Sequence, residues 1–268
     1  MDIRQRTHLE ILVKNKGFDF TDTFFPYTSG QIGPYYVNSE VVMNDGLDYH
    51  HSIEAMCNLI IEVCNDKGYN PKNSVISGGE SRDWIFSLPV SSRLEMPHLM
   101  IYKNMKTSGP DIKGKNVFHV ADLNNEGSSP RDKWVPTIKK LGGSIKDIFF
   151  YVDRLEDGSK VMKELGLESH CIVPLNADSW DHLLEYNKIT DEIYRSLRER
   201  MENKDEWAKK MLRSDAGYKK WVELWEKEPN KAANIVTAGY LDIKSEMMGR
   251  LSVQDREVWN NINPCLLV

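Results

Sequence analysis

The stretch that decides the fold is HVADLNNEGSSPRDKW, His119 to Trp134. An apolar run over 116–121 predicts a buried strand, and Asp122 stands at its end. A short polar loop, 123–128, follows, and a helix is expected from Pro130. A strand, a loop and a helix in this order form an anion site in parallel sheets, because the loop presents its N–H groups at the carboxyl end of the strand.

The start of the expected helix carries its own signals. Ser129 suits the N-cap, Pro130 suits the first helical position, and Asp132 completes a variant of the capping box. The amides of Gly127, Ser128 and Ser129 would then be exposed at the helix N-terminus. The pattern predicts that these three residues receive a phosphate.

The surrounding sequence alternates short apolar runs with helical patterns, which is typical of βαβ units. Strands are expected near 74–77, 98–102, 116–123, 145–153 and 170–175, and helices near 48–67, 81–94, 130–141 and 156–165. Glycines stand where several of these helices should end. The sequence therefore predicts an α/β fold with a doubly wound parallel sheet.

After Leu175 the composition changes. Residues 177–268 hold five of the seven tryptophans and repeated helical spacing, and Trp221 and Trp225 should share one face of one helix. We expect two domains, 1–176 and an all-helical extension, 177–268. The extension either covers the sheet and a dimer contact or serves as a docking module for a partner.

Composition excludes several classes of function. A net charge of −5 offers no basic surface for nucleic acid or for an anionic membrane. No segment approaches the roughly 18 apolar residues of a spanning helix, so a cytoplasmic location is expected by default. The four cysteines lack metal-ligand spacing, so they are interpreted as buried thiols, and no metal bound directly by protein residues is expected.

Several motifs, in order, resemble the type I phosphoribosyltransferases, and most closely the orotate phosphoribosyltransferase branch. The signature is an apolar strand that leads to two acids and a small-residue turn, as in HVADLNNEGSS. The other matches are FPYTSGQIGPYYVN (25–38), SGGESR (77–82), YKNMK (102–106) and the pair Asp153-Arg154. The resemblance covers about residues 8–175 and implies that family's fold, with an N-terminal hood region.

The resemblance also implies roles for individual residues. Asp122, Lys103 and Lys106 would be catalytic, with Asp122 on the ribose hydroxyls and the two lysines on pyrophosphate. Substrate would further be bound by Arg82 at the pyrophosphate, Gly127, Ser128 and Ser129 at the 5′-phosphate, Arg154 at the base and the Tyr35-Tyr36 pair by stacking. Magnesium would be the cofactor. Other interpretations stay open: surface roles for Arg82 and the lysines, a pair between Arg154 and Glu156 or Asp157, and core packing for the tyrosines.

Departures from the family pattern fall at functional positions. Ala121 replaces the first acid, and Glu126 puts a carboxylate in the phosphate turn. Like charges 4 Å apart repel by roughly 4 kcal/mol at an effective dielectric constant of 20. The lid is cut down to TSGPDIKG (107–114), and Tyr102 stands in place of an arginine. Glu80, Arg82 and Asp83 are close together in the sequence, which suggests a new polar group.

Two functions follow as hypotheses. The first is orotate phosphoribosyltransferase-like transfer of phosphoribosyl from phosphoribosyl pyrophosphate (PRPP) to a pyrimidine base, with pyrophosphate released. The second is a non-catalytic nucleotide-binding, anion-binding or regulatory protein on the same fold. Both expect a small-molecule phosphoribosyl or nucleotide ligand, neither expects nucleic acid or membrane as a partner, and the resemblance implies a homodimer.

Overall fold

The computed structural model describes residues 1–251, which form two compact units. Unit 1 comprises 1–17 and 38–182, and unit 2 comprises 18–37 and the chain from 183 onward. The packing units therefore cross the expected domains, 1–176 and 177–268, because the segment 18–37 packs with the C-terminal helices. The domain boundary itself stays a prediction.

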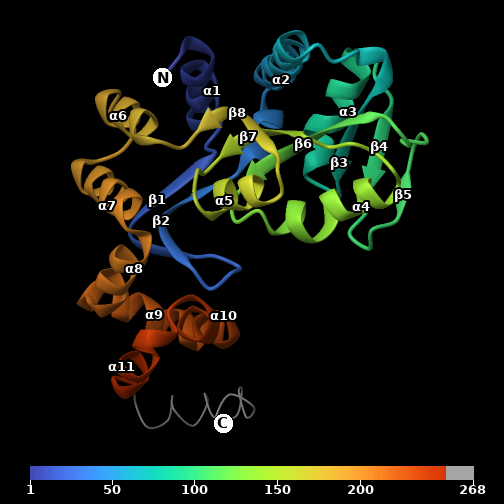
Figure 1. Cartoon of the computed structure of the whole chain (residues 1–268). Coiled ribbons are helices and arrows are strands. Elements are labelled where there is room, and N and C mark those ends of the chain that lie inside the picture. The colour runs from blue at the N-terminus through green and yellow to red at the C-terminus, as the bar shows by residue number, and fades with distance from the viewer. Residues whose placement is uncertain (252–268) are drawn as a thin grey trace. The chain divides into compact units, whose positions relative to one another are not determined.

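Unit 1 is built on a six-stranded sheet in the order β5-β4-β3-β6-β7-β8 (Figure 1). The strands are β3 (Ser74–Gly79), β4 (His98–Ile101), β5 (Thr107–Ser108), β6 (Asn116–Asn124), β7 (Asp147–Asp153) and β8 (Glu168–Pro174). All pairs are parallel except β4 with the short β5. The five expected strands are confirmed, and β5 was not foreseen.

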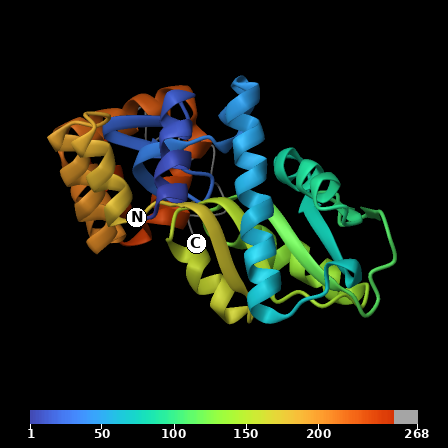
Figure 2. The ribbon, with the colours of Figure 1, turned by 90° about the horizontal axis from the view of Figure 1, so that it is seen from above.

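Helices cover both faces of this sheet, as expected for a doubly wound fold (Figure 2). They are α1 (Ile3–Lys14), α2 (Gly46–Lys67), α3 (Asp83–Arg93), α4 (Val135–Lys140) and α5 (Asp157–Glu164), with short turns η1 (Ser39–Asn44), η2 (Pro71–Asn73) and η3 (Pro130–Trp134). Tyr151 of β7 marks one face, because it contacts His8 of α1, Ser52 of α2 and Phe86 of α3. On the other face, Phe150 belongs to a core cluster with side chains of η3, α4 and α5.

The local details at the loop after β6 differ from the prediction. The strand continues to Asn124, because Leu123 and Asn124 still pair with β7. Helical backbone begins at Ser128, and Ser129 is helical with no side-chain capping bond. Asp132 pairs with Arg131 at 2.8 Å. The expected N-cap and capping box are therefore wrong, since the turn places the helix start before Ser129.

Unit 2 joins an antiparallel hairpin to a helical bundle. The hairpin consists of β1 (Phe18–Pro26) and β2 (Ile32–Val37). The helical elements are α7 (Asp191–Glu202), α8 (Lys204–Arg213), α9 (Asp215–Lys227), α10 (Pro229–Asn234), η4 (Ile235–Gly239), η5 (Leu241–Ile243) and α11 (Lys244–Gly249). Helix α6 (Ala177–Glu185) carries the chain from unit 1 into unit 2.

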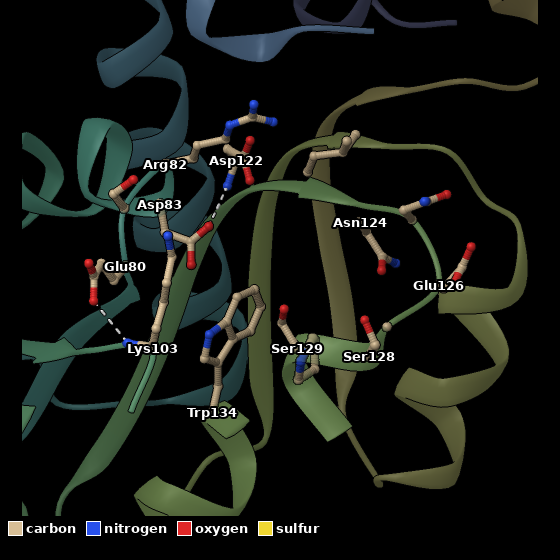
Figure 3. A pocket seen from close by; sticks show the side chains of 15 residues that line it. Glu80, Arg82, Asp83, Lys103, Asp122, Asn124, Glu126, Ser128, Ser129 and Trp134 are labelled. Carbon is tan, nitrogen blue, oxygen red and sulfur yellow. Dashed lines mark hydrogen bonds between the residues drawn. The ribbon is translucent and has the colours of Figure 1, made fainter. Parts of the chain in front are cut away.

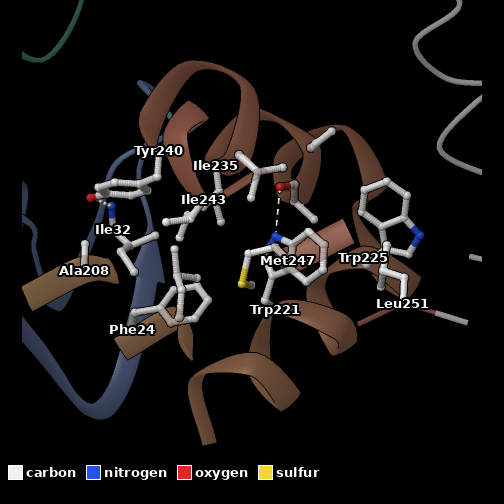
Figure 4. Packing of buried hydrophobic residues seen from close by; sticks show 14 of the residues in the cluster. Phe24, Ile32, Ala208, Trp221, Trp225, Ile235, Tyr240, Ile243, Met247 and Leu251 are labelled. Atoms are coloured by element: carbon white, nitrogen blue, oxygen red, sulfur yellow. Dashed lines mark hydrogen bonds between the residues drawn. The ribbon is translucent and has the colours of Figure 1, made fainter. Parts of the chain in front are cut away.

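Aromatic and aliphatic side chains together form the core of unit 2 (Figure 4). Trp221 and Trp225 are buried on one face of α9, with ring centroids 5.7 Å apart, as the spacing predicts. The Trp221 indole N–H donates to the carbonyl of Ala232 at 3.0 Å. Phe24 and Ile32 of the hairpin belong to the same cluster, so the hairpin and the helical extension share one core.

Cys57 and Cys64 are buried free thiols, as predicted, Cys171 is partly buried, and Cys265 lies outside the described residues, as does Trp259. Within residues 1–251, no helix combines the length and the apolar character that crossing a membrane requires.

Candidate functional site

A cavity of about 280 Å³ opens in unit 1 at the carboxyl ends of β3, β4 and β6 (Figure 3). Its walls are the segment 80–83 after β3, Lys103 after β4, the segment 122–130 and Trp134. The chain runs from β3 outward to β4 but from β6 to β7 in the opposite direction. The cavity therefore lies at the topological switch point, where open α/β sheets bind ligands.

The loop 123–129 forms one wall of the cavity. Its backbone conformation and the lack of space explain why residue 127 is a glycine. Gly127 has a positive φ of +70°, and a Cβ at this position would lie 2.8 Å from the Cβ of Val161. The amide of Arg131 donates to the Gly127 carbonyl at 3.1 Å, so the first helical turn starts here. The N–H groups at such a start have no intrahelical acceptor, and Gly127, Ser128 and Ser129 line the cavity. Phosphate binding by these residues stays a prediction.

Glu126 lines the same wall, next to Ser128 (Figure 3). Its carboxylate adds negative charge to the loop that would bind an anion. The repulsion between Glu126 and a phosphate stays a prediction.

Asp122 projects from β6 into the cavity wall and is 8% exposed. The hydroxyl of Ser39 donates to its Oδ2 at 3.0 Å. Burial, and next the neighbouring charge of Asp83, raise the pKa of Asp122 to about 7. An acid of this kind can accept hydrogen bonds from a ligand or hold a proton near neutral pH.

Asp83 is the second buried acid of the cavity, at the start of α3. Its Oδ1 accepts the backbone N–H of Asp122 at 3.2 Å, and its Oδ2 accepts that of Gly79 at 2.8 Å. Burial raises the pKa of Asp83 to about 7. Sequence reasoning noted Asp83 beside Glu80 and Arg82 but gave it no role, because nothing local places it against β6.

His119 lies beneath this pair and is completely buried. Its Nδ1 is 2.9 Å from the Ser77 hydroxyl, its ring stacks on Trp134 at 4.1 Å, and its Nε2 lies 3.6 Å from Asp83 Oδ2. Burial lowers the pKa of His119 to about 3, so the ring is neutral at physiological pH. Sequence reasoning missed both His119 and Ser39 as parts of the site.

The predicted cationic residues are only partly brought together. Arg82 and Lys103 line the cavity, whereas Lys106 is exposed outside the lining. Arg82 forms an ion pair with Glu40 of η1. The backbone N–H of Lys103 donates to the Glu80 carboxylate at 2.9 Å, which fixes the chain where its ammonium group reaches the cavity.

The residues expected at the base are not among those that line this cavity in unit 1. Arg154 is 5% exposed, pairs with Glu156 at 3.0 Å and is not part of the cavity lining. Tyr35 and Tyr36 belong to β2 in unit 2, where Tyr35 is buried and Tyr36 is 41% exposed. The core-packing interpretation therefore describes Tyr35, and pairing with Glu156 describes Arg154.

A second polar cluster lies at the opposite end of the sheet, where β7 and β8 begin. Asp147, Glu168 and His170 place ligand-type atoms within 4.8 Å of one another. The Lys67 ammonium group pairs with Asp147 and, at 2.7 Å, with Glu168. This lysine already supplies the positive charge that a bound metal ion would supply.

Comparisons with known proteins agree with the resemblance in the motifs. No family model matches the chain. The orotate phosphoribosyltransferase of Saccharolobus solfataricus is 26% identical over 179 residues, which cover 65% of this chain and 86% of that protein. An adenine phosphoribosyltransferase of Haemophilus influenzae is also 26% identical, over 149 residues, 47% of this chain and 80% of that protein.

The comparison with solved structures agrees with the comparison of sequences. The crystal structure of orotate phosphoribosyltransferase from Francisella tularensis superposes with a TM-score of 0.57 at 18% identity, over 73% of this chain and 98% of that one. At this identity the likeness concerns the fold alone. The chain is similar in sequence to orotate and adenine phosphoribosyltransferases, and its fold is similar to that of an orotate phosphoribosyltransferase.

Proposed function

We propose that the cavity at the carboxyl ends of β3, β4 and β6 binds a phosphoribosyl ligand and that the protein transfers phosphoribosyl from PRPP to a pyrimidine base. Phosphoribosyl transfer as a class is supported by similarity to both orotate and adenine phosphoribosyltransferases. The observation that carries the proposal is the meeting, in one cavity, of a helix start, a buried acid and a cationic side chain.

Each part of the cavity has a chemical task in this proposal. The amides of Gly127, Ser128 and Ser129 bind the 5′-phosphate, and Asp122 accepts hydrogen bonds from the ribose hydroxyls. Lys103 and Arg82 line the cavity. In this proposal they offset the charge that develops on the leaving pyrophosphate. Positioning of the two reactants then supplies much of the rate.

Magnesium is proposed as the cofactor, because the oxygen-rich wall formed by Asp83 and Asp122 suits a hydrated hard cation. The carboxylate of Asp122 would accept a hydrogen bond from metal-bound water. When bound, the ion would neutralise part of the pyrophosphate charge. A homodimer is proposed on the resemblance alone, and light scattering of the purified protein would measure its mass.

A second candidate function is favoured by two observations. Ala121 lacks the first acid of the family pair, and Glu126 lines the phosphate wall. Both changes fall at positions where the family binds its substrate, whereas the residues around them still form a cavity. The alternative is a non-catalytic protein that binds a nucleotide or another anion in the same place.

Calorimetric titration with PRPP, with magnesium and with EDTA, tests binding first. Lys103→Ala should weaken binding about ten-fold or more, as expected when a charged partner of a phosphate is lost. Lys72→Ala is the matched control, because this exposed lysine lies in η2 at the other end of β3. No binding at millimolar PRPP would rule out the proposed function.

Turnover separates the two candidates once binding is established. Release of pyrophosphate is measured with orotate, with uracil and with adenine as acceptors. Activity with orotate or uracil supports the transferase with a pyrimidine substrate. Tight binding without turnover on any base would instead identify the non-catalytic alternative.

A further inference from the structure

Asp83 and Asp122 reach the cavity from two different strand ends. Asp83 follows β3, and Asp122 is part of β6, 39 residues later. The hydrogen bond from the Asp122 amide to Asp83 Oδ1 holds the two residues together at 3.2 Å. Two carboxyl groups therefore line one cavity side by side, although they are far apart in the sequence.

The carboxylate of Asp83 lies on the same face of the sheet as Ala121. Side chains alternate along a strand, so His119 and Ala121 of β6 point to the same face. Ala121 and Trp134 belong to the core cluster on that face, and His119 stacks on Trp134. Asp83 Oδ2 lies 3.6 Å from His119 Nε2 on this side of the sheet.

The space around Gly79 independently supports this location of the Asp83 carboxylate. A Cβ on Gly79 would lie 2.3 Å from Trp134 Nε1 and 2.6 Å from Asp83 Oδ2. The carboxylate of Asp83 and the indole of Trp134 therefore both lie against Gly79. A glycine at position 79 leaves the space that this carboxylate occupies.

The carboxylate of Asp83 retains acceptor capacity. Each of its oxygens accepts one backbone N–H, and an ionised carboxylate offers about four acceptor positions. The neutral His119 ring and the Trp134 indole restrict its rotation, and two N–H groups fix its plane. It is a rigid acceptor next to Asp122, in the wall of a cavity of about 280 Å³.

We propose that Asp83 supplies, beside Asp122, the second carboxylate with which the cavity binds two adjacent hydroxyl groups of a phosphorylated ribose. The carboxylate absent at Ala121 is in this way provided from another strand end. The proposal rests on the proposed function, since it names the residue that completes the sugar subsite. It makes Asp83 a substrate-binding residue, and a sugar phosphate that lacks one of the two hydroxyl groups should bind less tightly.

The test compares two sugar phosphates that differ in one hydroxyl group, ribose 5-phosphate and 2-deoxyribose 5-phosphate. Calorimetry of the full chain should show a preference for ribose 5-phosphate of about ten-fold or more, the size of one hydrogen bond to a charged group. Asp83→Asn keeps the shape of the side chain but halves its acceptor oxygens. It should lose most of that preference by weakening ribose 5-phosphate and leaving 2-deoxyribose 5-phosphate nearly unchanged.

Asp132→Asn is the matched control, because Asp132 is an exposed carboxylate near the cavity that pairs with Arg131. It should keep the full preference. A wild-type protein that prefers ribose 5-phosphate, together with an Asp83→Asn variant that keeps the same preference, would overturn the assignment and leave the proposed function standing. A wild-type protein that binds neither sugar phosphate nor PRPP would overturn both.

A second measurement keeps the test decisive if Asp83→Asn does not fold. In wild-type protein labelled with carbon-13 at aspartate carboxyl groups, the assigned Asp83 resonance should shift on saturation with ribose 5-phosphate. It should shift less with 2-deoxyribose 5-phosphate. An unchanged Asp83 resonance in the saturated complex would contradict the proposal.

Discussion

The backbone N–H of Asp122 donates to the carboxylate of Asp83 across the gap between β6 and the start of α3. Strand β3 ends at Gly79, so β6 has no strand partner on that side at residue 122. The Asp83 side chain replaces the missing strand and also accepts the Gly79 amide. One acid thus closes the sheet at the switch point and contributes to the cavity wall.

Restoring an acid at position 121 should be costly in this chain. Ala121 is fully buried in an apolar cluster on the face where Asp83 lies. We expect Ala121→Asp to lower the free energy of unfolding by about 3 kcal/mol, because an unpaired carboxyl would be buried. In a protein that already carries Asp83→Asn, Ala121→Asp should lower the free energy of unfolding by about 1 kcal/mol less. The new carboxyl group then has no second carboxylate beside it. Urea unfolding of the four proteins measures this coupling, and additive costs would show that positions 83 and 121 do not share one space.

Asp83 should also make stability depend on pH. Its pKa is raised from 3.8 to about 7 in the folded protein, so between these values the folded state holds more protons than the unfolded chain. The contribution of Asp83 to stability therefore falls as pH rises from about 4 to about 7, by at most about 1.4 kcal/mol per pH unit, and is constant above. Relative to wild type, Asp83→Asn should be more stable at pH 8 than at pH 5.

The comparison with Asp83→Asn is needed because buried histidines act in the opposite direction. Burial lowers the pKa of His8 and His98 to about 4 and that of His119 to about 3, so their contribution rises with pH. His8 and His98 are present in both proteins, so their contributions cancel in the difference. A difference in unfolding free energy that does not change between pH 5 and pH 8 would show that Asp83 is ionised throughout.

The parallel sheet could be predicted because its strands are buried on both faces and are therefore apolar throughout. The position of Asp122 at a strand end could also be predicted, since the strand that carries it is a clear apolar run. The hydrogen bond from the Asp122 amide to Asp83 could not be predicted, because it joins residues from separate βα units. The sharing of one core by Phe24 and Trp221 was likewise hidden, since the hairpin and α9 lie far apart in sequence.

Some local signals were overridden by packing. Ser129 and Pro130 look like a helix start, yet the turn at Gly127 begins the helix at Ser128. Lys103 and Lys106 look equivalent in sequence, yet only Lys103 lines the cavity. In each case the decisive fact is the path of the backbone, which residue types alone do not determine.

The polar cluster at the start of β7 should stabilise the fold rather than bind metal. Burial alone would raise the pKa of Asp147, but hydrogen bonds from His170, Lys67 and Tyr69 hold it at about 2. Asp147→Ala should cost about 2–3 kcal/mol at pH 7, because it leaves charged and polar donors without their acceptor. The stabilisation is present above pH 4 and is lost as pH falls toward 2, since the folded pKa lies below the unfolded one.

Zinc distinguishes the two interpretations of this cluster. If Lys67 is the resident cation, adding zinc or magnesium should leave the thermal midpoint of wild-type protein unchanged. Lys67→Met removes the ammonium group and should lower stability, with metal still absent. A midpoint that rises with added zinc in wild-type protein would instead show that a metal ion displaces Lys67.

Gly127 should be the least replaceable residue of the phosphate wall. An alanine there would adopt a φ of +70° and would bring its Cβ within 2.8 Å of Val161 and 3.0 Å of Met162. We expect Gly127→Ala to lower the free energy of unfolding by about 1–3 kcal/mol through backbone strain and the displaced helix α5. It should also weaken binding of PRPP more than stability alone explains, because the amides of residues 127–129 move together.

Gly166→Ala is the matched control: this glycine also has a positive φ, +71°, but its Cβ would meet no atom within 4 Å and it lies outside the cavity. Equal loss of stability with unchanged PRPP affinity in both variants would show that the turn at Gly127 does not shape the ligand site.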